Sequence, residues 1–259
     1  MKNRFGRPLL ILLCLTSSRI TAAETIIQES PIKISTSDEQ DIFPQSWRSG
    51  RISARGQSIQ NSEISRSQRI LNAAMKKYPG HMLTSNIEAV YVLHRLEYSG
   101  ISAGGSNSRN RIYIANRGSR DGSTDCFVEG IFHAEFSSIL LRNFPQLLDT
   151  QTWNAANNTS FKYGSSGVQA VRDGRARQRF DATSHFEGFL YEYAKSTLEN
   201  DFNSIAKHMF LGDSQFWFAV NNYERIRKKA NLAVDFYHRA DSSFNRSFFE
   251  SLRNSCNTR

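Results

Sequence analysis

The residues with the clearest chemical potential lie in the segment EGIFHAEFSSILL, which runs from Glu129 to Leu141. Within it, His133 could bind a divalent metal ion through its imidazole, and Glu135 could polarise a metal-bound water. Apolar residues recur around these two at helical spacing, so we expect an amphipathic helix that stops at residues 143–145. The segment is therefore a candidate hydrolytic site, and an ordinary helix that contains one histidine is the alternative.

The spacing in this segment departs from the pattern that zinc chemistry needs. In the motif HExxH, two histidines four residues apart bind the same Zn²⁺ from one helical face, and the adjacent glutamate activates water. If His133 is the first ligand, Ala134 takes the glutamate position and Ser137 the second histidine. If Glu135 is the glutamate, Ala134 and Ser138 take the two histidine positions. Neither register supplies a pair of imidazoles.

A second pattern lies downstream, in the segment EGFLYEYAKSTLENDFNSIAKHMF at residues 187–210. Together with the strand-like residues 112–116 and the helix that carries His133 and Glu135, this segment resembles zincin-type metallopeptidases of the gluzincin arrangement. In those proteins a similar segment reads G-F-x-x-x-Y-A, followed by E-D-F-A-E. The matching positions here are Gly188, Phe189, Tyr193, Ala194 and Asn200-Asp201-Phe202. The resemblance covers residues 63–252 and puts Asn200 where the relatives have a ligand glutamate.

The resemblance implies a fold, a cofactor and a set of site residues. Glu135 would be the catalytic base, and His133 would hold the metal together with Glu199 or Asp201, the carboxylates on either side of Asn200. The implied cofactor is Zn²⁺, and a protein that binds no metal is the alternative. The implied fold class is α+β and zincin-like, with a small mixed sheet packed on the active-site-type helix and a mainly helical C-terminal half.

The N-terminal residues predict export. Basic residues precede an apolar run at residues 9–15, and Thr21-Ala22-Ala23 offers small side chains to a signal peptidase, so residues 1–23 are interpreted as a signal peptide. The apolar run is too short to span a bilayer, and no later stretch approaches the roughly 20 apolar residues of a membrane helix. We expect a periplasmic or extracellular protein without a transmembrane segment.

The net charge and the basic runs bear on the type of partner, and the cysteines bear on a disulfide. The formal charge of +9 falls to +5 without residues 1–23, which hold four basic residues and no acidic one. The basic runs Arg172–Arg179 and Arg225–Lys229 contain no interleaved aromatic residues for base stacking, so we expect no nucleic-acid partner. An oxidising compartment favours one disulfide between Cys126 and Cys256, and two buried thiols are the alternative.

The chain after the signal peptide divides into a leader and a domain. Residues 24–61 are rich in Ser, Gln, Arg and Asp and predict a poorly ordered leader, whereas residues 62–259 predict one zincin-like, metallopeptidase-type domain. A long irregular region is expected at residues 147–183. The expected regular elements are a helix at residues 62–79, strands at Glu88–Gly100 and Asn110–Gly118, the helix of His133 capped by Thr124 or Asp125, and helices at residues 185–196, 198–210, 214–240 and 243–252.

Two functions of different classes follow from these observations. The first is a secreted metallopeptidase-like hydrolase that holds a peptide or protein substrate beside the strand Arg111–Asn116 by backbone pairing. The second is a non-catalytic secreted binding protein, which uses the same cleft or a basic surface to bind a peptide, a protein or cell-envelope material. The altered helix, with H-A-E-F-S-S in place of HExxH, predicts weak or absent peptidase activity.

Overall fold

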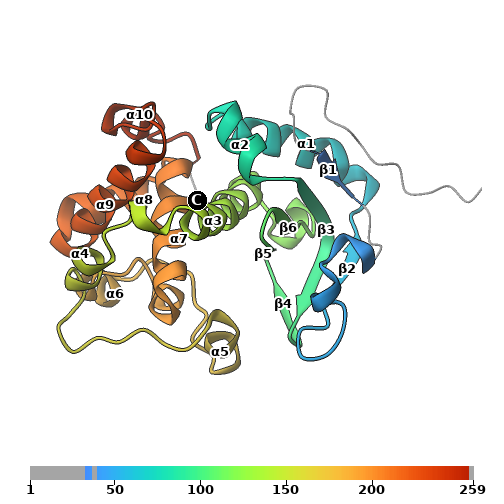
Figure 1. Ribbon diagram of the computed structural model, residues 1–259, viewed down its shortest axis with the longest axis horizontal. Helices are drawn as coiled ribbons and strands as arrows, with labels where there is room; N and C mark the ends of the chain where they lie inside the picture. Colours follow the sequence, from blue (N-terminus) through green and yellow to red (C-terminus); the bar gives the residue numbers. More distant parts are fainter. Residues whose placement is uncertain (1–32, 37–39, 257–259) are drawn as a thin grey trace, which may run out of the picture.

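A mixed β-sheet and the helices around it organise the chain (Figure 1). The computed structural model describes residues 33–36 and 40–256. In this part of the chain the fold is α+β, with six strands before residue 116 and a mainly helical half after it. The strands are β1 (Lys33–Ser35), β2 (Arg55–Ser58), β3 (Ala89–Tyr98), β4 (Ile101–Ala103), β5 (Gly105–Asn107) and β6 (Arg111–Ala115).

Strand β3 is the centre of the sheet. It pairs in parallel with β1 and β6, and antiparallel with β2 and β4. Strand β5 pairs antiparallel with β6, so the described sheet runs β1-β3-β6-β5 and ends at β5. Strands β3 and β6 confirm the two strands predicted at residues 88–100 and 110–118. Strand β6 lies between β3 and β5, so the strand expected above to pair with a substrate, Arg111–Asn116, is not at the edge of the described sheet, and β5 is.

Helix α3 lies between the sheet and the C-terminal helices (Figure 1). Its predicted cap is confirmed, because the Thr124 side chain accepts a hydrogen bond from the Phe127 N–H and satisfies a free donor of the first turn. The α-helices are α1 (Asn61–Met75), α2 (Gly80–Asn86), α3 (Asp125–Asn143), α4 (Thr150–Ala155), α5 (Gly167–Arg172), α6 (Ala182–Glu187), α7 (Leu198–Leu211), α8 (Ser214–Asn222), α9 (Glu224–Ala240) and α10 (Arg246–Ser251).

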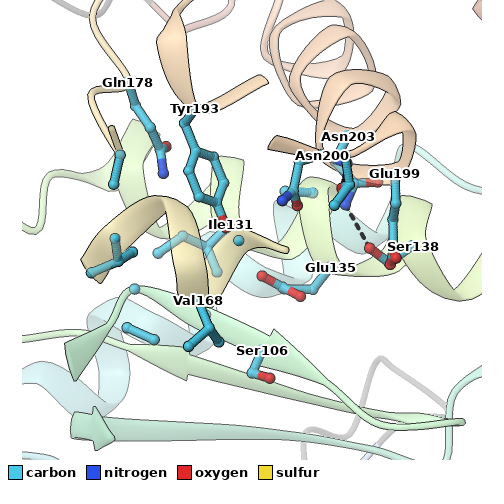
Figure 2. Close-up of a pocket in the computed structure, with 18 of the residues that line it drawn as sticks. Ser106, Ile131, Glu135, Ser138, Val168, Gln178, Tyr193, Glu199, Asn200 and Asn203 are labelled. Carbon is cyan, nitrogen blue, oxygen red and sulfur yellow. Dashed lines mark hydrogen bonds between the residues drawn. The ribbon is translucent and has the colours of Figure 1, made fainter. Parts of the chain in front are cut away.

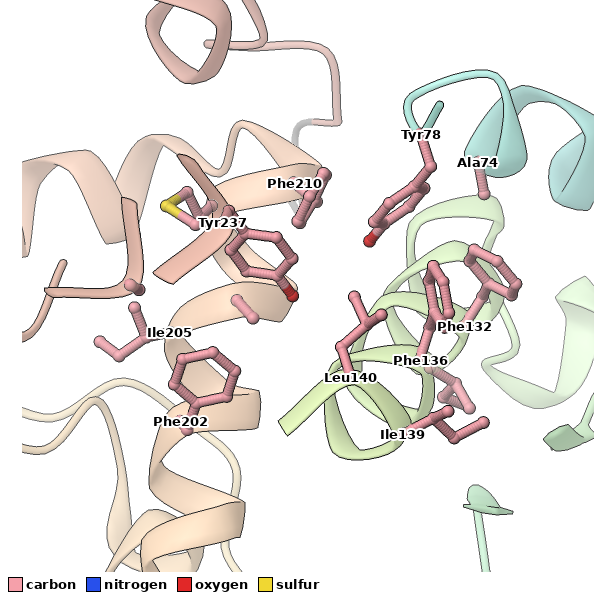
Figure 3. Close-up of a cluster of buried hydrophobic side chains, with 14 of the residues drawn as sticks. Ala74, Tyr78, Phe132, Phe136, Ile139, Leu140, Phe202, Ile205, Phe210 and Tyr237 are labelled. Carbon is pink, nitrogen blue, oxygen red and sulfur yellow. The ribbon is translucent and has the colours of Figure 1, made fainter. Parts of the chain in front are cut away.

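Aromatic side chains hold α3 beside α7 and α9 (Figure 3). Phe136 on α3, Phe210 on α7 and Tyr237 on α9 are fully buried, and the ring centroids of Phe210 and Tyr237 are 5.0 Å apart. Tyr78, which follows α1, stacks on Phe210 at 4.4 Å. Such rings bury large apolar areas and prefer these tilted or offset contacts. The packing fixes the relative positions of α3 and α7, and therefore of the polar residues between them.

The predicted disulfide between Cys126 and Cys256 is present. The two Cα atoms lie 5.7 Å apart, and the bridge joins the first turn of α3 to the end of the described chain. It therefore fastens the C-terminal segment to the helix at the centre of the fold.

The segment expected to be a poorly ordered leader contains regular structure in its described part. Residues 33–36 and 40–61 contain β1, β2 and two short 3-10 helices, η1 (Gln40–Ile42) and η2 (Gln45–Trp47). Phe43 is fully buried and stacks on Tyr113 of β6 at 4.9 Å. The few apolar residues of this segment pack on the sheet at irregular spacing, which gives no periodic signal. The predicted signal peptide, residues 1–23, lies outside the described residues.

The region after α3 is less irregular than predicted. Helices α4 and α5 lie within residues 147–183, and the helix expected at residues 185–196 is divided between α6 and the 3-10 helix η5 (Glu192–Ser196). Gly188, in the left-handed conformation at φ +97°, separates the two. No helix in the described ranges has both the length and the apolar character needed to cross a membrane.

Candidate binding cleft

A polar cleft of about 570 Å³ lies between the edge strand β5 and the helices α3 and α7 (Figure 2). Residues of α5 and η5 line its remaining side. We call it the α3–α7 cleft. Hydroxyl and amide side chains dominate its walls, among them Ser102, Ser106, Asn107, Ser138, Gln178, Asn200 and Asn203.

Helical spacing brings the cleft residues together. Positions three or four apart share one face of a helix, and the residues that line the cleft follow this rule: Ile131, Ala134, Glu135 and Ser138 on α3, and Asn200, Asn203 and Lys207 on α7. The two helices approach closely at Gly130, where an added β-carbon would lie 2.9 Å from Cε of Lys207. A residue larger than glycine at position 130 would displace the lysine stem.

Glu135 is the central acidic group of the cleft. Its Oε2 atom accepts a hydrogen bond of 2.7 Å from the Asn107 amide on β5. The backbone of β5 also passes close by, because a β-carbon on Gly105 would lie 2.8 Å from Glu135 Oε1 and 2.3 Å from Ile131 Cγ2. Burial, which disfavours the ionised carboxylate, raises the pKa of Glu135 to about 7. Glu135 therefore changes its charge near neutral pH.

This raised pKa predicts how Glu135→Gln changes stability with pH. The folded-state pKa of about 7 exceeds the ordinary value of 4.5, so the carboxyl group favours folding below pH 4.5 and this contribution is lost as the pH rises through 7. Glutamine does not titrate and keeps an oxygen that can accept from Asn107. Glu135→Gln should therefore be more stable than the wild type at pH 8, by about 2 kcal/mol after allowance for partial exposure, and similar at pH 4.5. Urea unfolding at both pH values measures this difference, and an equal gain in the exposed control Glu97→Gln would contradict burial as its cause.

The two positions that flank Glu135 on the cleft face are Ala134 and Ser138. The Ser138 hydroxyl accepts a hydrogen bond of 2.5 Å from the Asn203 amide nitrogen, and the Ser137 hydroxyl donates one of 2.7 Å to the Asn203 amide oxygen. These bonds link α3 to α7. They occupy position 138, where an HExxH motif with Glu135 as its glutamate would have its second histidine.

His133 lies in the core between α3 and α7 and does not line the cleft. Its Nδ1 atom is 2.8 Å from the Tyr78 hydroxyl, and its Nε2 atom is 3.3 Å from Glu129 Oε1. The ring also stacks on Phe210, with centroids 5.0 Å apart. Burial lowers the pKa of His133 to about 4, so the imidazole is neutral at neutral pH. Both ring nitrogens are engaged, which corrects the expectation that His133 and Glu135 share one site.

The two carboxylates predicted as metal ligands lie in different surroundings. Glu199 lines the cleft, and its half-exposed carboxylate is 3.7 Å from Arg142. Asp201 is fully buried on another side of α7, where its Oδ2 atom lies 2.6 Å from Lys229 Nζ and accepts a hydrogen bond of 2.7 Å from Tyr163. The structure thus brings Glu135 and Glu199 to one cleft and leaves His133 and Asp201 outside it.

The described residues contain no group of three or more His, Cys, Asp or Glu side chains placed to hold a metal ion. The donors that do line the cleft are mostly amides and hydroxyls, which are weak ligands for zinc compared with imidazole and thiolate. The cleft residues therefore do not fit the Zn²⁺ that the sequence resemblance implies.

Sequence reasoning missed Asn107, Asn203 and Lys207. A signal existed for the two on α7, because they stand three and seven positions after Asn200 and so share its face. No signal existed for Asn107, since β5 reads Gly-Ser-Asn and has none of the β-branched or aromatic residues that mark strands.

No family model, no curated protein and no solved structure matches the chain.

Proposed function

We propose that this chain is an exported, non-catalytic peptide-binding protein on a zincin-like scaffold, and that the α3–α7 cleft receives an extended peptide. One observation carries the proposal. Ala134 and Ser138 flank Glu135 where zinc-binding histidines would stand, yet a cleft of about 570 Å³ still opens beside an edge strand. A cleft beside an edge strand could hold a peptide without any metal ligand at these two positions.

The replaced ligands argue against hydrolysis. A catalytic zinc site uses three protein ligands and leaves one position for water. The methyl group of Ala134 has no electron pair to donate, and the Ser138 hydroxyl is already bonded to Asn203. Without a metal-bound water, Glu135 has nothing to activate in the manner of a metallopeptidase. Its hydrogen bond with Asn107 instead fastens β5 to α3.

The edge strand supports an extended peptide as the ligand. Residues 104 and 108, just beyond the two ends of β5, make backbone hydrogen bonds with β6. Backbone groups alternate between the two sides of an antiparallel strand, so those of Gly105 and Asn107 face away from β6. Both residues line the cleft. An extended peptide could therefore add to the sheet at β5, with its side chains directed alternately toward the cleft and away from it.

Export is supported by two independent features. The sequence of residues 1–23 has the charge pattern, apolar run and small residues of a signal peptide. The disulfide between Cys126 and Cys256 is a bond that persists in oxidising compartments.

Filling the cleft should abolish peptide binding. We expect the wild type, dialysed to equilibrium against a pool of random tetrapeptides with free termini, to retain peptides that mass spectrometry detects. Ala134→Phe projects a ring into the cleft from a position that already faces it, and should lower retention by about 10-fold or more, which corresponds to about 1.4 kcal/mol.

The matched control is Ala155→Phe, which adds the same ring at an exposed position of α4 outside the cleft. It should retain peptides as the wild type does. Retention that is equal in both variants, or absent in the wild type, would refute binding at the α3–α7 cleft.

A further inference from the structure

The charged groups that line the α3–α7 cleft differ in how they are paired. Glu135 accepts a hydrogen bond from Asn107, and Glu199 lies 3.7 Å from Arg142. By contrast, the Lys207 ammonium forms no hydrogen bond and no ion pair with any residue in the described ranges. The cleft therefore contains a positive charge that no described anion contacts directly, although the charges of Glu135 and Asp213 act on it.

The position of Lys207 is built into the fold. Its aliphatic stem packs on Gly130, which leaves room for it between α3 and α7. Burial lowers the pKa of the Lys207 amine, because the ammonium loses hydration there, and the nearby charges of Asp213 and Glu135 offset this loss only in part. A ligand anion beside the ammonium would compensate for the lost hydration. The resulting charge-assisted hydrogen bond is stronger than one between neutral groups.

Positive charge continues beyond Lys207 at the same end of the cleft. A second cavity of about 300 Å³ adjoins the first and shares Gly104, Phe127 and Gln178 with it. Arg95 and Arg117 line this cavity, and neither guanidinium forms an ion pair with a residue that the structure describes. Lys207, Arg95 and Arg117 therefore produce a positive electrostatic potential near the first residue of β5.

The opposite end of the cleft carries Glu199. Helix α7 runs antiparallel to α3 here, because Lys207 packs on Gly130 whereas Glu199 lies near Arg142, twelve positions later on α3. Strand β5 runs the same way as α3, since Gly105 lies against Ile131 and Asn107 bonds to Arg142. The first residue of β5 is therefore at the Lys207 end, and the last is at the Glu199 end.

We infer that the cleft recognises a peptide carboxylate at Lys207, with the peptide running antiparallel to β5 so that its C-terminal end lies beside Gly104. This inference rests on the proposed function and adds a ligand group and a direction to it. Glu199 and Lys207 are eight positions apart on α7, which corresponds to roughly 12 Å along the helix axis at about 1.5 Å per residue. An extended chain covers that distance with about four residues.

The test uses the intact protein and three pools of random tetrapeptides. The first has free carboxyl termini, the second is amidated and lacks Asp and Glu, and the third is amidated and contains them. In equilibrium dialysis, the wild type should retain the first pool at least about 10-fold better than the second. If the third pool is retained, the recognised carboxylate belongs to an acidic side chain. If the third pool is not retained, the recognised carboxylate is the C-terminus. Both outcomes support a carboxylate site.

The variant Lys207→Met keeps the stem on Gly130 and removes the charge. It should lower retention of the first pool to that of the second, while Lys228→Met, at an exposed position of α9, should not. Thermal unfolding checks that both variants fold, and Lys207→Met should be no less stable than the wild type, because it removes an unpaired charge. Equal retention of the first and second pools by the wild type, or an unchanged preference in Lys207→Met, would overturn this inference and leave the proposed function standing. Retention of no pool would instead refute the proposed function and the inference together.

Discussion

Asp201→Ala is expected to lower the free energy of unfolding by about 3–5 kcal/mol, because it leaves the ammonium of Lys229 buried without its anion. Both side chains have an exposure of 0%, and the distance between Nζ and Oδ2 is 2.6 Å. The substitution also removes the acceptor of the Trp153 and Tyr163 hydrogen bonds. Gly188 O, at 2.7 Å, would be the remaining close oxygen for the ammonium. Urea unfolding measures the loss.

Two comparisons make this result specific. The double variant Asp201→Leu with Lys229→Met replaces the pair by apolar groups and should recover most of the stability, since a buried pair adds little over well-packed hydrophobic residues. Glu224→Ala breaks an exposed ion pair on α9, with Lys228, and should leave the urea unfolding midpoint almost unchanged. A loss below about 1 kcal/mol for Asp201→Ala would contradict a structural role for Asp201 and reopen its interpretation as a ligand.

Removal of the disulfide is expected to have the second largest effect. The cysteines are 130 positions apart, and the chain-entropy account gives about 5 kcal/mol for a loop of that length. We expect the variant Cys126→Ala with Cys256→Ala to lose about 3–5 kcal/mol in urea unfolding, the lower part of this range allowing for residual structure in the unfolded chain.

The same bridge can be opened chemically in the wild type. Unfolding in the presence of dithiothreitol should match that of the double cysteine variant, and dithiothreitol should leave the variant unchanged. If reducing agent leaves the wild-type unfolding midpoint where it was, the bridge contributes nothing to stability in solution.

Elements with strong periodic signals were predictable from the sequence. Strands β3 and β6 follow from their Val, Ile and Tyr content, and α3 follows from its apolar spacing and its Thr124 cap. Short elements without such signals were missed, including β1, β5 and α5. Their residues take up strand or helix structure because neighbouring elements supply the hydrogen bonds and packing, and that information is not local in the sequence.

The candidate site was predictable only in part. Glu135 and Glu199 were identified as site residues and do line one cleft. His133 was grouped with them because it is two positions from Glu135, but two positions on a helix differ by about 200° around the axis. Which of the two faces the sheet edge depends on how α3 is rotated in the core, and that rotation is set by rings such as Phe132 and Phe136.

The metal requirement for peptide binding tests the central claim most directly. A tetrapeptide retained in dialysis would be titrated into the wild type, first with EDTA present and then with excess Zn²⁺, and recovered afterwards for mass analysis. We predict the same Kd under both conditions, to within about twofold or about 0.4 kcal/mol, and an intact peptide. Binding that appears only with Zn²⁺, or cleavage of the peptide when Zn²⁺ is added, would contradict the account.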